Sequence, residues 1–287
     1  IKDTPDEDAH DTICELVFKD NPLGKSIIGT TTTLKRISRE VLMDYIDQQY
    51  TKDSIVVSVA GNFQSELVEE IIAGRLDGLK EKKNPVEYPE ETYVPSFKVK
   101  VKDIEQTHLC LATRSVSLAD PRYYAFALLN NIMGGSMSSR FFQNIREQKG
   151  LAYSVYSMNS AFTQNGYYNI YAGVSHDKIK DTIAAIKEEL SLLKEHGVTA
   201  DELAKAKEQL KSAYIFGQEN VNGRMFAIGK TMTLQGRIYT PEEVMHEIDK
   251  VTLEDIGNVA EIICDIQQYS GVAVTDRRID LRKMIQG

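Results

Sequence analysis

The sequence predicts an α+β protein built from two homologous domains. Three observations carry this prediction: a length of 287 residues, a mixture of helical and strand-like hydrophobic patterns, and an internal repeat. The length exceeds what one ordinary core needs and fits two domains of roughly 100 to 200 residues each. An apolar fraction of 42% is sufficient for two packed cores.

A proline-rich segment marks the predicted domain boundary. Three of the seven prolines lie close together in the charged run EKKNPVEYPEETYVPSFK. Proline fixes φ and removes a backbone donor, so this run is typical of an extended linker. We therefore predict a first domain over 1–80, a linker over 81–97 and a second domain over 98–287.

The first domain is predicted to contain a helix, a strand and a second helix. Residues 37–49 (ISREVLMDYIDQQ) carry apolar side chains at helical spacing, and Ser38 is a suitable N-cap. Residues 54–61 (SIVVSVAG) form a β-branched apolar run that ends in glycine, which predicts a strand. The run SELVEEIIAGRL that follows returns to helical spacing.

The second domain is predicted to begin with two strands, FKVKVK and THLCLAT, followed by two helices. The first of these helices starts at Asp120 and Pro121, an N-cap and an N1 proline. The second, SSRFFQNIREQKG, is ended by its glycine. Residues 152–160 and 166–174 are aromatic and β-branched, which predicts a hairpin.

The remainder of the second domain is mainly helical. A long amphipathic helix covers 178–195, and Thr199 with Glu202 forms a capping box for the next helix. Thr240 followed by proline and two glutamates predicts the start of another. The run YSGVAVTD is the last predicted strand.

The internal repeat pairs residues 37–61 with residues 251–276. Each copy has a hydroxyl N-cap, a helix and a V-x-V strand, and each lies downstream of a glycine, Gly29 or Gly236. The chain ahead of the first copy is shorter by roughly 110 residues, so we expect a first domain truncated at its N-terminus. The two segments should superpose in separate domains. Chance recurrence of a common helix-strand pattern is the alternative.

Composition excludes several classes of function. No run approaches the ~18 apolar residues of a membrane helix, and the acidic start beginning with Ile1 is unlike a signal peptide, so we expect a soluble cytoplasmic protein. A net charge of −8 argues against nucleic-acid binding and favours basic peptides as partners. Three widely separated cysteines in apolar surroundings are typical of buried free thiols. A catalytic thiol is the alternative.

Metal-ligand spacing is absent from the sequence. The five histidines are His10, His108, His176, His196 and His246. None lies within one helical turn of another, so neither an HExxH nor an HxxEH motif can form. We therefore predict no metal ligand in this chain. A nucleophile elbow, a P-loop and a dinucleotide fingerprint are also missing.

The segment 138–157 (SSRFFQNIREQKGLAYSVYS) holds the candidate site. Arg146 lies near the end of a predicted helix, and Tyr153 lies at a strand entrance seven residues later. A guanidinium and a phenol placed in this way can grip a carbonyl group and donate to a developing oxyanion. An exposed arginine and a packing tyrosine are the alternative. Gly134 and Gly135 precede this segment, either as a tight turn or as a phosphate cradle.

The run SRFFQNIREQKGLAYSVYS resembles the hallmark of the second domain of the pitrilysin-like zinc peptidases. This family includes insulin-degrading enzyme, mitochondrial processing peptidase and bacterial processing proteases, and the resemblance is strongest to the last group. DNPLGKSIIGT and YTKDSIVVSVAGNF are similar to the end of the family's first domain.

The resemblance implies two homologous α+β domains around a chamber, each a mainly antiparallel sheet with helices packed on it. It implies that Arg146 and Tyr153 are catalytic residues, and that both contact the substrate together with Gly134 and Gly135. It also implies a zinc cofactor, whose ligands would lie in an N-terminal segment absent from this sequence.

The function implied by the resemblance is that of a zinc-dependent endopeptidase that hydrolyses peptides or presequences. This chain would supply the domain that contacts the substrate and the transition state. A non-catalytic scaffold or substrate-binding subunit of the same fold is the alternative. The expected partner is a peptide, with no nucleic acid and no membrane, and the working unit is either a monomer or a homodimer.

Overall fold

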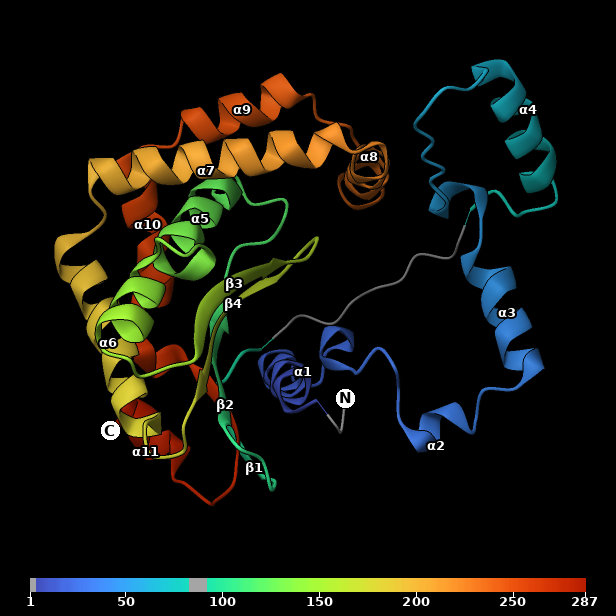
Figure 1. Cartoon of the computed structure of the whole chain (residues 1–287). Helices are drawn as coiled ribbons and strands as arrows, with labels where there is room; N and C mark the ends of the chain where they lie inside the picture. The colour runs from blue at the N-terminus through green and yellow to red at the C-terminus, as the bar shows by residue number, and fades with distance from the viewer. Residues whose placement is uncertain (1–3, 83–91) are drawn as a thin grey trace. The chain divides into compact units, whose positions relative to one another are not determined.

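The structure is a computed structural model that describes residues 4–82 and 92–287 (Figure 1). These residues form two compact units. Unit 1 contains the described residues up to Lys25, those from 92 to Lys211, and Met245–Gly287. Unit 2 contains residues 26–82 and Ser212–Val244.

Unit 1 is built on one five-stranded sheet. Its strands are β1 (Phe97–Val101), β2 (Thr107–Arg114), β3 (Ser154–Ala161), β4 (Gly166–Val174) and β5 (Ser270–Thr275). The strand order is β1-β5-β2-β4-β3, and every pairing is antiparallel except the parallel pair of β1 and β5. The predicted α+β class, the predicted hairpin and the other strands predicted after the linker are confirmed.

Helices cover both faces of this sheet. The helices α5 (Tyr123–Asn130), α6 (Ile179–His196) and α10 (Leu253–Cys264) lie on one face, and α1 (Pro5–Val17) lies on the other (Figure 1). The helix α11 (Leu281–Gln286) packs against β1 and β5. Within residues 4–82 and 92–287, none of the helices combines the length and the hydrophobicity that crossing a bilayer requires.

Local sequence signals set where several of these helices begin. Ahead of α7 (Ala200–Glu219), the Thr199 hydroxyl accepts the Glu202 N–H at 3.2 Å, and the Glu202 carboxylate accepts the Thr199 N–H at 2.9 Å. This reciprocal pair is the predicted capping box. The helix α5 begins later than predicted, because the Asp120 carboxylate accepts the Arg122 N–H at 2.8 Å and forms a turn ahead of the helix.

Unit 2 is helical where it is regular. It contains α2 (Thr31–Leu34), α3 (Arg39–Gln49), α4 (Ser65–Leu76) and α8 (Val221–Gln235), together with the later part of α7 and the start of α9 (Pro241–Asp249). The strand predicted over 54–61 is wrong: the short 3-10 turn η2 (Lys52–Ser54) leads into a run that is not part of any described sheet. A strand requires a paired neighbour, and the described residues of unit 2 offer none.

The two copies of the repeat nevertheless share one order of elements. In each, a hydroxyl N-cap starts a helix, a 3-10 turn follows, and an extended run comes last: Ser38, α3 and η2 in the first copy, and Thr252, α10 and η5 (Ile266–Gln268) in the second. The glycines upstream of both copies have left-handed φ values of +67° and +70°. The two copies lie in different units.

Helices are exchanged in both directions between the predicted domains. The helix α1 precedes the predicted linker but packs on β2 and β5 in unit 1. The helix α8 follows the linker but lies in unit 2, where the Ser58 hydroxyl donates to the Met225 carbonyl at 2.8 Å. The compact units therefore differ from the predicted ranges 1–80 and 98–287 by the described residues up to Lys25 and by Ser212–Val244, which holds α8, the end of α7 and the start of α9. Most of the predicted linker 81–97 lies outside the described residues.

Docking of α1 combines apolar burial with one charged cluster. Ile13 and Val17 are at most 1% exposed against the apolar face of the sheet. The Asp8 carboxylate lies 2.7 Å from the Nζ atoms of both Lys100 and Lys102. Burial acts to raise the pKa of Asp8, but the hydrogen bonds from the two lysines outweigh it and the pKa is lowered.

We expect Asp8→Ala to lower the free energy of unfolding at pH 7 by about 1–3 kcal/mol, because it leaves two partly buried ammonium groups without their carboxylate. Urea denaturation followed by circular dichroism measures this loss. Because the folded pKa of Asp8 is lowered, the stabilisation is present above the ordinary value of 3.8 and is lost as the pH falls through the folded pKa.

Glu15→Ala is the matched control, because the pair of Glu15 with Lys98 also joins α1 to β1 but is largely exposed. Its expected cost is below about 1 kcal/mol. Equal losses for the two variants would contradict the assignment of Asp8 as the electrostatic anchor of α1.

Candidate functional site

The candidate site lies between two wide helical turns and the edge strand β3. The π-helical turns are η3 (Asn131–Gly135) and η4 (Phe142–Gln148). Turns of this kind are rare and occur frequently at functional sites. The sequence predicted helices that reach over both of them but not their π-helical hydrogen bonding. Arg146 lies on η4, and Tyr153 immediately precedes β3.

The turn between Arg146 and Tyr153 is closed by backbone hydrogen bonds. The Gly150 N–H donates to the Arg146 carbonyl at 3.2 Å, and the Leu151 N–H donates to the Ile145 carbonyl at 3.0 Å. Gly150 has a φ of +58°, a left-handed conformation that glycine adopts at low cost. The two candidate residues therefore lie at the two ends of one short, ordered connection.

The Arg146 side chain is restricted by two neighbouring side chains but remains accessible to solvent. Its guanidinium lies 4.8 Å from the centre of the Phe142 ring, and its Nε lies 3.8 Å from the Glu147 carboxylate. The side chain is 43% exposed. Stacking on an aromatic face restricts a guanidinium while leaving its N–H donors free for a ligand.

Tyr153 is fixed through its backbone and not through its ring. Its N–H donates to the Gly173 carbonyl at 2.9 Å, which joins it to the end of β4. The residue is 65% exposed. A ring this exposed gains little from burial, so core packing does not account for a tyrosine at this position.

The two glycines have different surroundings. Gly134 is buried, and a Cβ atom there would lie 2.4 Å from the backbone nitrogen of Ser157 on β3. The backbone of η3 therefore packs directly on the strand, which explains Gly134 without a ligand. Gly135 is exposed, and a Cβ atom there would lie 3.1 Å from Asn130 Nδ2. Their predicted contact with substrate stays a prediction.

Two polar residues that sequence reasoning missed hold η4 in place. The Arg140 guanidinium makes two hydrogen bonds to the Glu202 carboxylate, at 2.7 and 2.9 Å, and Asn144 Nδ2 donates to the Glu189 carboxylate at 2.7 Å. Burial acts to raise the pKa of Glu202, but the charge and hydrogen bonds of Arg140 together with hydrogen bonds from Thr199 outweigh it and lower the pKa to about 2. Arg140 and Asn144 are four positions apart, one helical turn, and this spacing was the sequence signal that they lie on the same side of the segment.

The thiols do not supply a nucleophile. Burial raises the pKa of the Cys110 thiol to about 12 and the pKa of the Cys14 and Cys264 thiols to about 11. All three are protonated at neutral pH, and the thiolate is the reactive form. The surroundings of the three thiols therefore give no support to the alternative of a catalytic cysteine.

The donor set of the described residues does not fit a zinc ion. Nowhere in 4–82 or 92–287 do three or more histidine, cysteine, aspartate or glutamate side chains converge on one point. His10 and His108 approach the same phenol, because His10 stacks on the Tyr171 ring at 5.1 Å and His108 Nδ1 lies 2.8 Å from its hydroxyl. Two imidazoles committed to phenols are insufficient for the three or four ligands of zinc.

Comparison with known proteins defines the family. The model described as "Peptidase M16 inactive domain" matches residues 36–210. A Bacillus subtilis protein named "Uncharacterized zinc protease YmxG" is 36% identical over 90% of this chain, and a Rickettsia felis protein named "Uncharacterized zinc protease" is 35% identical over 91%. The chain spans 63% of the length of each of these relatives.

Solved structures share the fold. A peptidase M16 inactive domain from Pseudomonas fluorescens gives a TM-score of 0.87 at 20% identity, over 96% of this chain and 66% of its own. A chain of "Complex III2 from Candida albicans" gives a TM-score of 0.87 at 16% identity, over 99% of this chain and 70% of its own. The chain belongs to the peptidase M16 family, and the resemblance to pitrilysin-like zinc peptidases is confirmed.

We expect Gly134→Ala to lower the free energy of unfolding by about 1–3 kcal/mol or more, because the added methyl group overlaps the backbone of β3. Thermal or urea unfolding of the purified chain measures the loss. Gly257→Ala is the control, since no atom lies within 4 Å of the added Cβ in the middle of α10. That variant should gain about 0.5–1 kcal/mol. Unchanged stability of Gly134→Ala would contradict the packing role.

Proposed function

We propose that this chain is the substrate-contacting and transition-state-contacting part of a zinc-dependent endopeptidase that hydrolyses peptides or presequences. The observation that carries the proposal is the pair of accessible side chains, Arg146 and Tyr153, at the two ends of one hydrogen-bonded turn in an M16 chain. The names of the two bacterial relatives support a zinc protease as the whole protein.

The proposed roles follow from the chemistry of the two groups. Arg146 offers charge-assisted donors that hold and orient a carbonyl group of the peptide. The Tyr153 hydroxyl donates to the oxygen that becomes negative when the peptide carbonyl turns tetrahedral. The zinc ion and its ligands are proposed to lie outside this chain, since the residues described here do not fit it.

The charge of the chain supports a preference for basic substrates. A net charge of −8 attracts cationic peptides and repels acidic ones before contact is made. The three free thiols support a reducing compartment, for which we propose the cytoplasm. The working unit is proposed as a monomer or a homodimer.

A non-catalytic scaffold or substrate-binding subunit is the second candidate. The description of the matching family model as an inactive domain favours it, as does the likeness in fold to a chain of an assembly named "Complex III2". The two candidates differ in one respect: only the peptidase requires the Tyr153 hydroxyl for turnover.

We expect Tyr153→Phe to lower kcat by roughly 10²–10³ with little change in KM, when the chain is assayed within a protein of the length of its relatives. The substitution removes one hydroxyl and keeps the ring, so folding should be unaffected. Hydrolysis of an unstructured basic peptide supplies both constants. A wild-type kcat would show that Tyr153 has no catalytic role.

Arg146→Ala should raise KM as well as lower kcat, because an orienting contact acts on the bound substrate as well as on the transition state. Arg146→Lys is the matched control: it keeps the charge but loses the planar set of donors, so its effect on KM should be smaller. Identical kinetics of Arg146→Ala and the wild type would remove this residue from the proposed site.

The 287-residue chain alone should bind far less than one equivalent of zinc, because its histidines do not converge. Equilibrium dialysis against micromolar zinc followed by metal analysis measures the stoichiometry. One tightly bound zinc ion per chain would contradict the proposal that the ligands lie elsewhere.

A further inference from the structure

Among residues 4–82 and 92–287, β1 forms one edge of the sheet and has a neighbouring strand on one side only. The Gly271 N–H donates to the Ser96 carbonyl at 2.9 Å, and the Lys102 N–H donates to the Thr275 carbonyl at 2.9 Å. In a parallel pair, alternate residues of a strand bond to the neighbour, so the even-numbered residues of β1 bond to β5. The N–H and C=O groups of Phe97, Val99 and Val101 therefore point away from the sheet.

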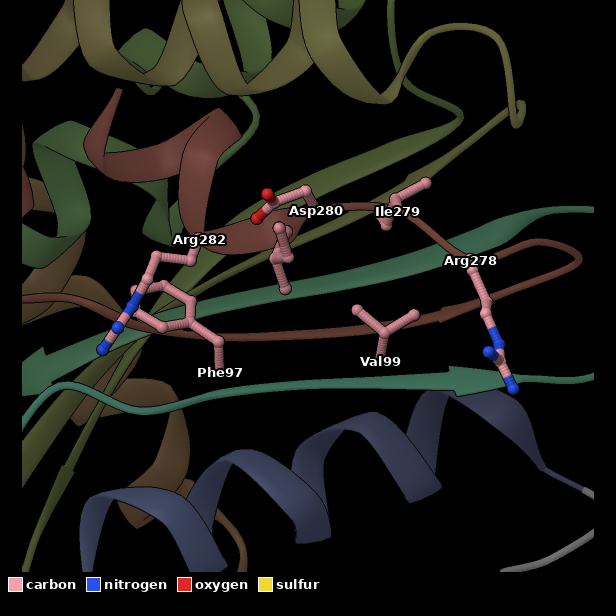
Figure 2. Close-up of a pocket in the computed structure, with 7 residues that line it drawn as sticks. Phe97, Val99, Arg278, Ile279, Asp280 and Arg282 are labelled. Carbon is pink, nitrogen blue, oxygen red and sulfur yellow. The ribbon is translucent and has the colours of Figure 1, made fainter.

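A groove runs along this edge. Two adjoining hollows of about 520 and about 660 Å³ share Val99, Arg278 and Ile279 in their walls. Phe97 and Arg282 line one end, and Val101 lines the other. In Figure 2, β1 forms the floor, while Arg282 lies beside Phe97 and Arg278 lies beyond Val99. The groove therefore extends along the length of β1.

The charged groups of the groove are mainly basic. Arg278 and Arg282 are exposed, and within the described part of the chain no carboxylate pairs with either guanidinium. Arg282 is held over the Phe97 ring at 5.3 Å. Asp280 is the acidic side chain of the lining, and its carboxylate accepts the Lys283 N–H at 3.0 Å as the N-cap of α11. Arg278 and Arg282 therefore give this groove a positive local charge, although the chain as a whole has a net charge of −8.

The lysines of β1 do not protect the edge on this side. Exposed edge strands are commonly guarded by lysine side chains. Here Lys98, Lys100 and Lys102 alternate with the groove residues and extend to the opposite face, where they pair with Glu15 and Asp8 of α1. The side chains of β1 that line the groove are therefore apolar, and the arginines on the opposite wall are basic.

We propose that the groove along β1 binds an extended, acidic peptide segment, which adds to the sheet as a sixth strand. Backbone hydrogen bonds to Phe97, Val99 and Val101 would supply affinity, and carboxylates facing Arg278 and Arg282 would supply selectivity. This site is separate from the proposed catalytic pair, because Tyr153 adjoins β3 at the other edge of the sheet. It also favours the opposite charge from the basic substrate proposed above.

The test uses the purified 287-residue chain and a fluorescein-labelled peptide of about eight residues in which valine and glutamate alternate. Fluorescence anisotropy should give saturable binding that weakens with salt, and a peptide with lysine in place of glutamate should bind at least about tenfold more weakly. Equal binding of the two peptides, or no saturable binding of the glutamate peptide, overturns the proposal.

Two variants locate the bound peptide. Val99→Pro removes one outward N–H from an edge position that tolerates proline, and Arg278→Glu reverses one charge; each should raise Kd about tenfold. Lys283→Glu makes the same charge change on α11 outside the groove lining and should leave Kd within about twofold. If Val99→Pro does not fold by circular dichroism, Arg278→Glu still decides. Unchanged affinity of a folded variant places the peptide elsewhere, as on β3, and overturns the proposal.

Discussion

The burial of α1 against the sheet is the constraint on which the rest of unit 1 depends. With α1 on one face and α5, α6 and α10 on the other, the inner strands are enclosed on both sides (Figure 1). Seven of the eight residues of β2 and all residues of β4 and β5 are buried, so these strands lack the alternation of a half-exposed sheet. Asp8 fixes where α1 lies along this surface, because it must reach both Lys100 and Lys102. Only the edge strands are left to present groups to a ligand.

This enclosure places the candidate catalytic pair on rigid supports. The backbone of η3 contacts β3 through Gly134, and Arg140 ties the start of the next turn to Glu202. The chain from there to Tyr153 is short and hydrogen-bonded, so the accessible side chains belong to an ordered backbone. Because these residues are already ordered, little further conformational entropy is lost when the site contacts a transition state.

The sequence predicted those features that depend on neighbouring residues. The capping box at Thr199, the hairpin of β3 and β4, and the helix after Ser38 all follow from local chemistry. The strand expected over 54–61 failed because pairing depends on a distant neighbour. The exchange of α1 and α8 between the predicted domains was missed for the same reason, and α8 itself carries little amphipathic pattern. Arg146 and Tyr153 were proposed from a motif, whereas the spacing of Arg140 and Asn144 did not reveal their partners, which come from α6 and α7.

The exchange of helices has a consequence for how the chain reaches its native state. The helix α1 packs on β5, although the two are separated by about 250 residues of chain, and loop-closure entropy opposes contacts between such distant segments. On a ribosome, α1 emerges before both of its partner strands, and the part of its apolar stripe that packs on β5 stays unburied long after β2 has been synthesised. Folding of unit 1 is therefore completed only after β5 has been synthesised, and the long sequence separation of its contacts makes it a slow folder. A nascent chain of this design depends on protection from aggregation during that interval.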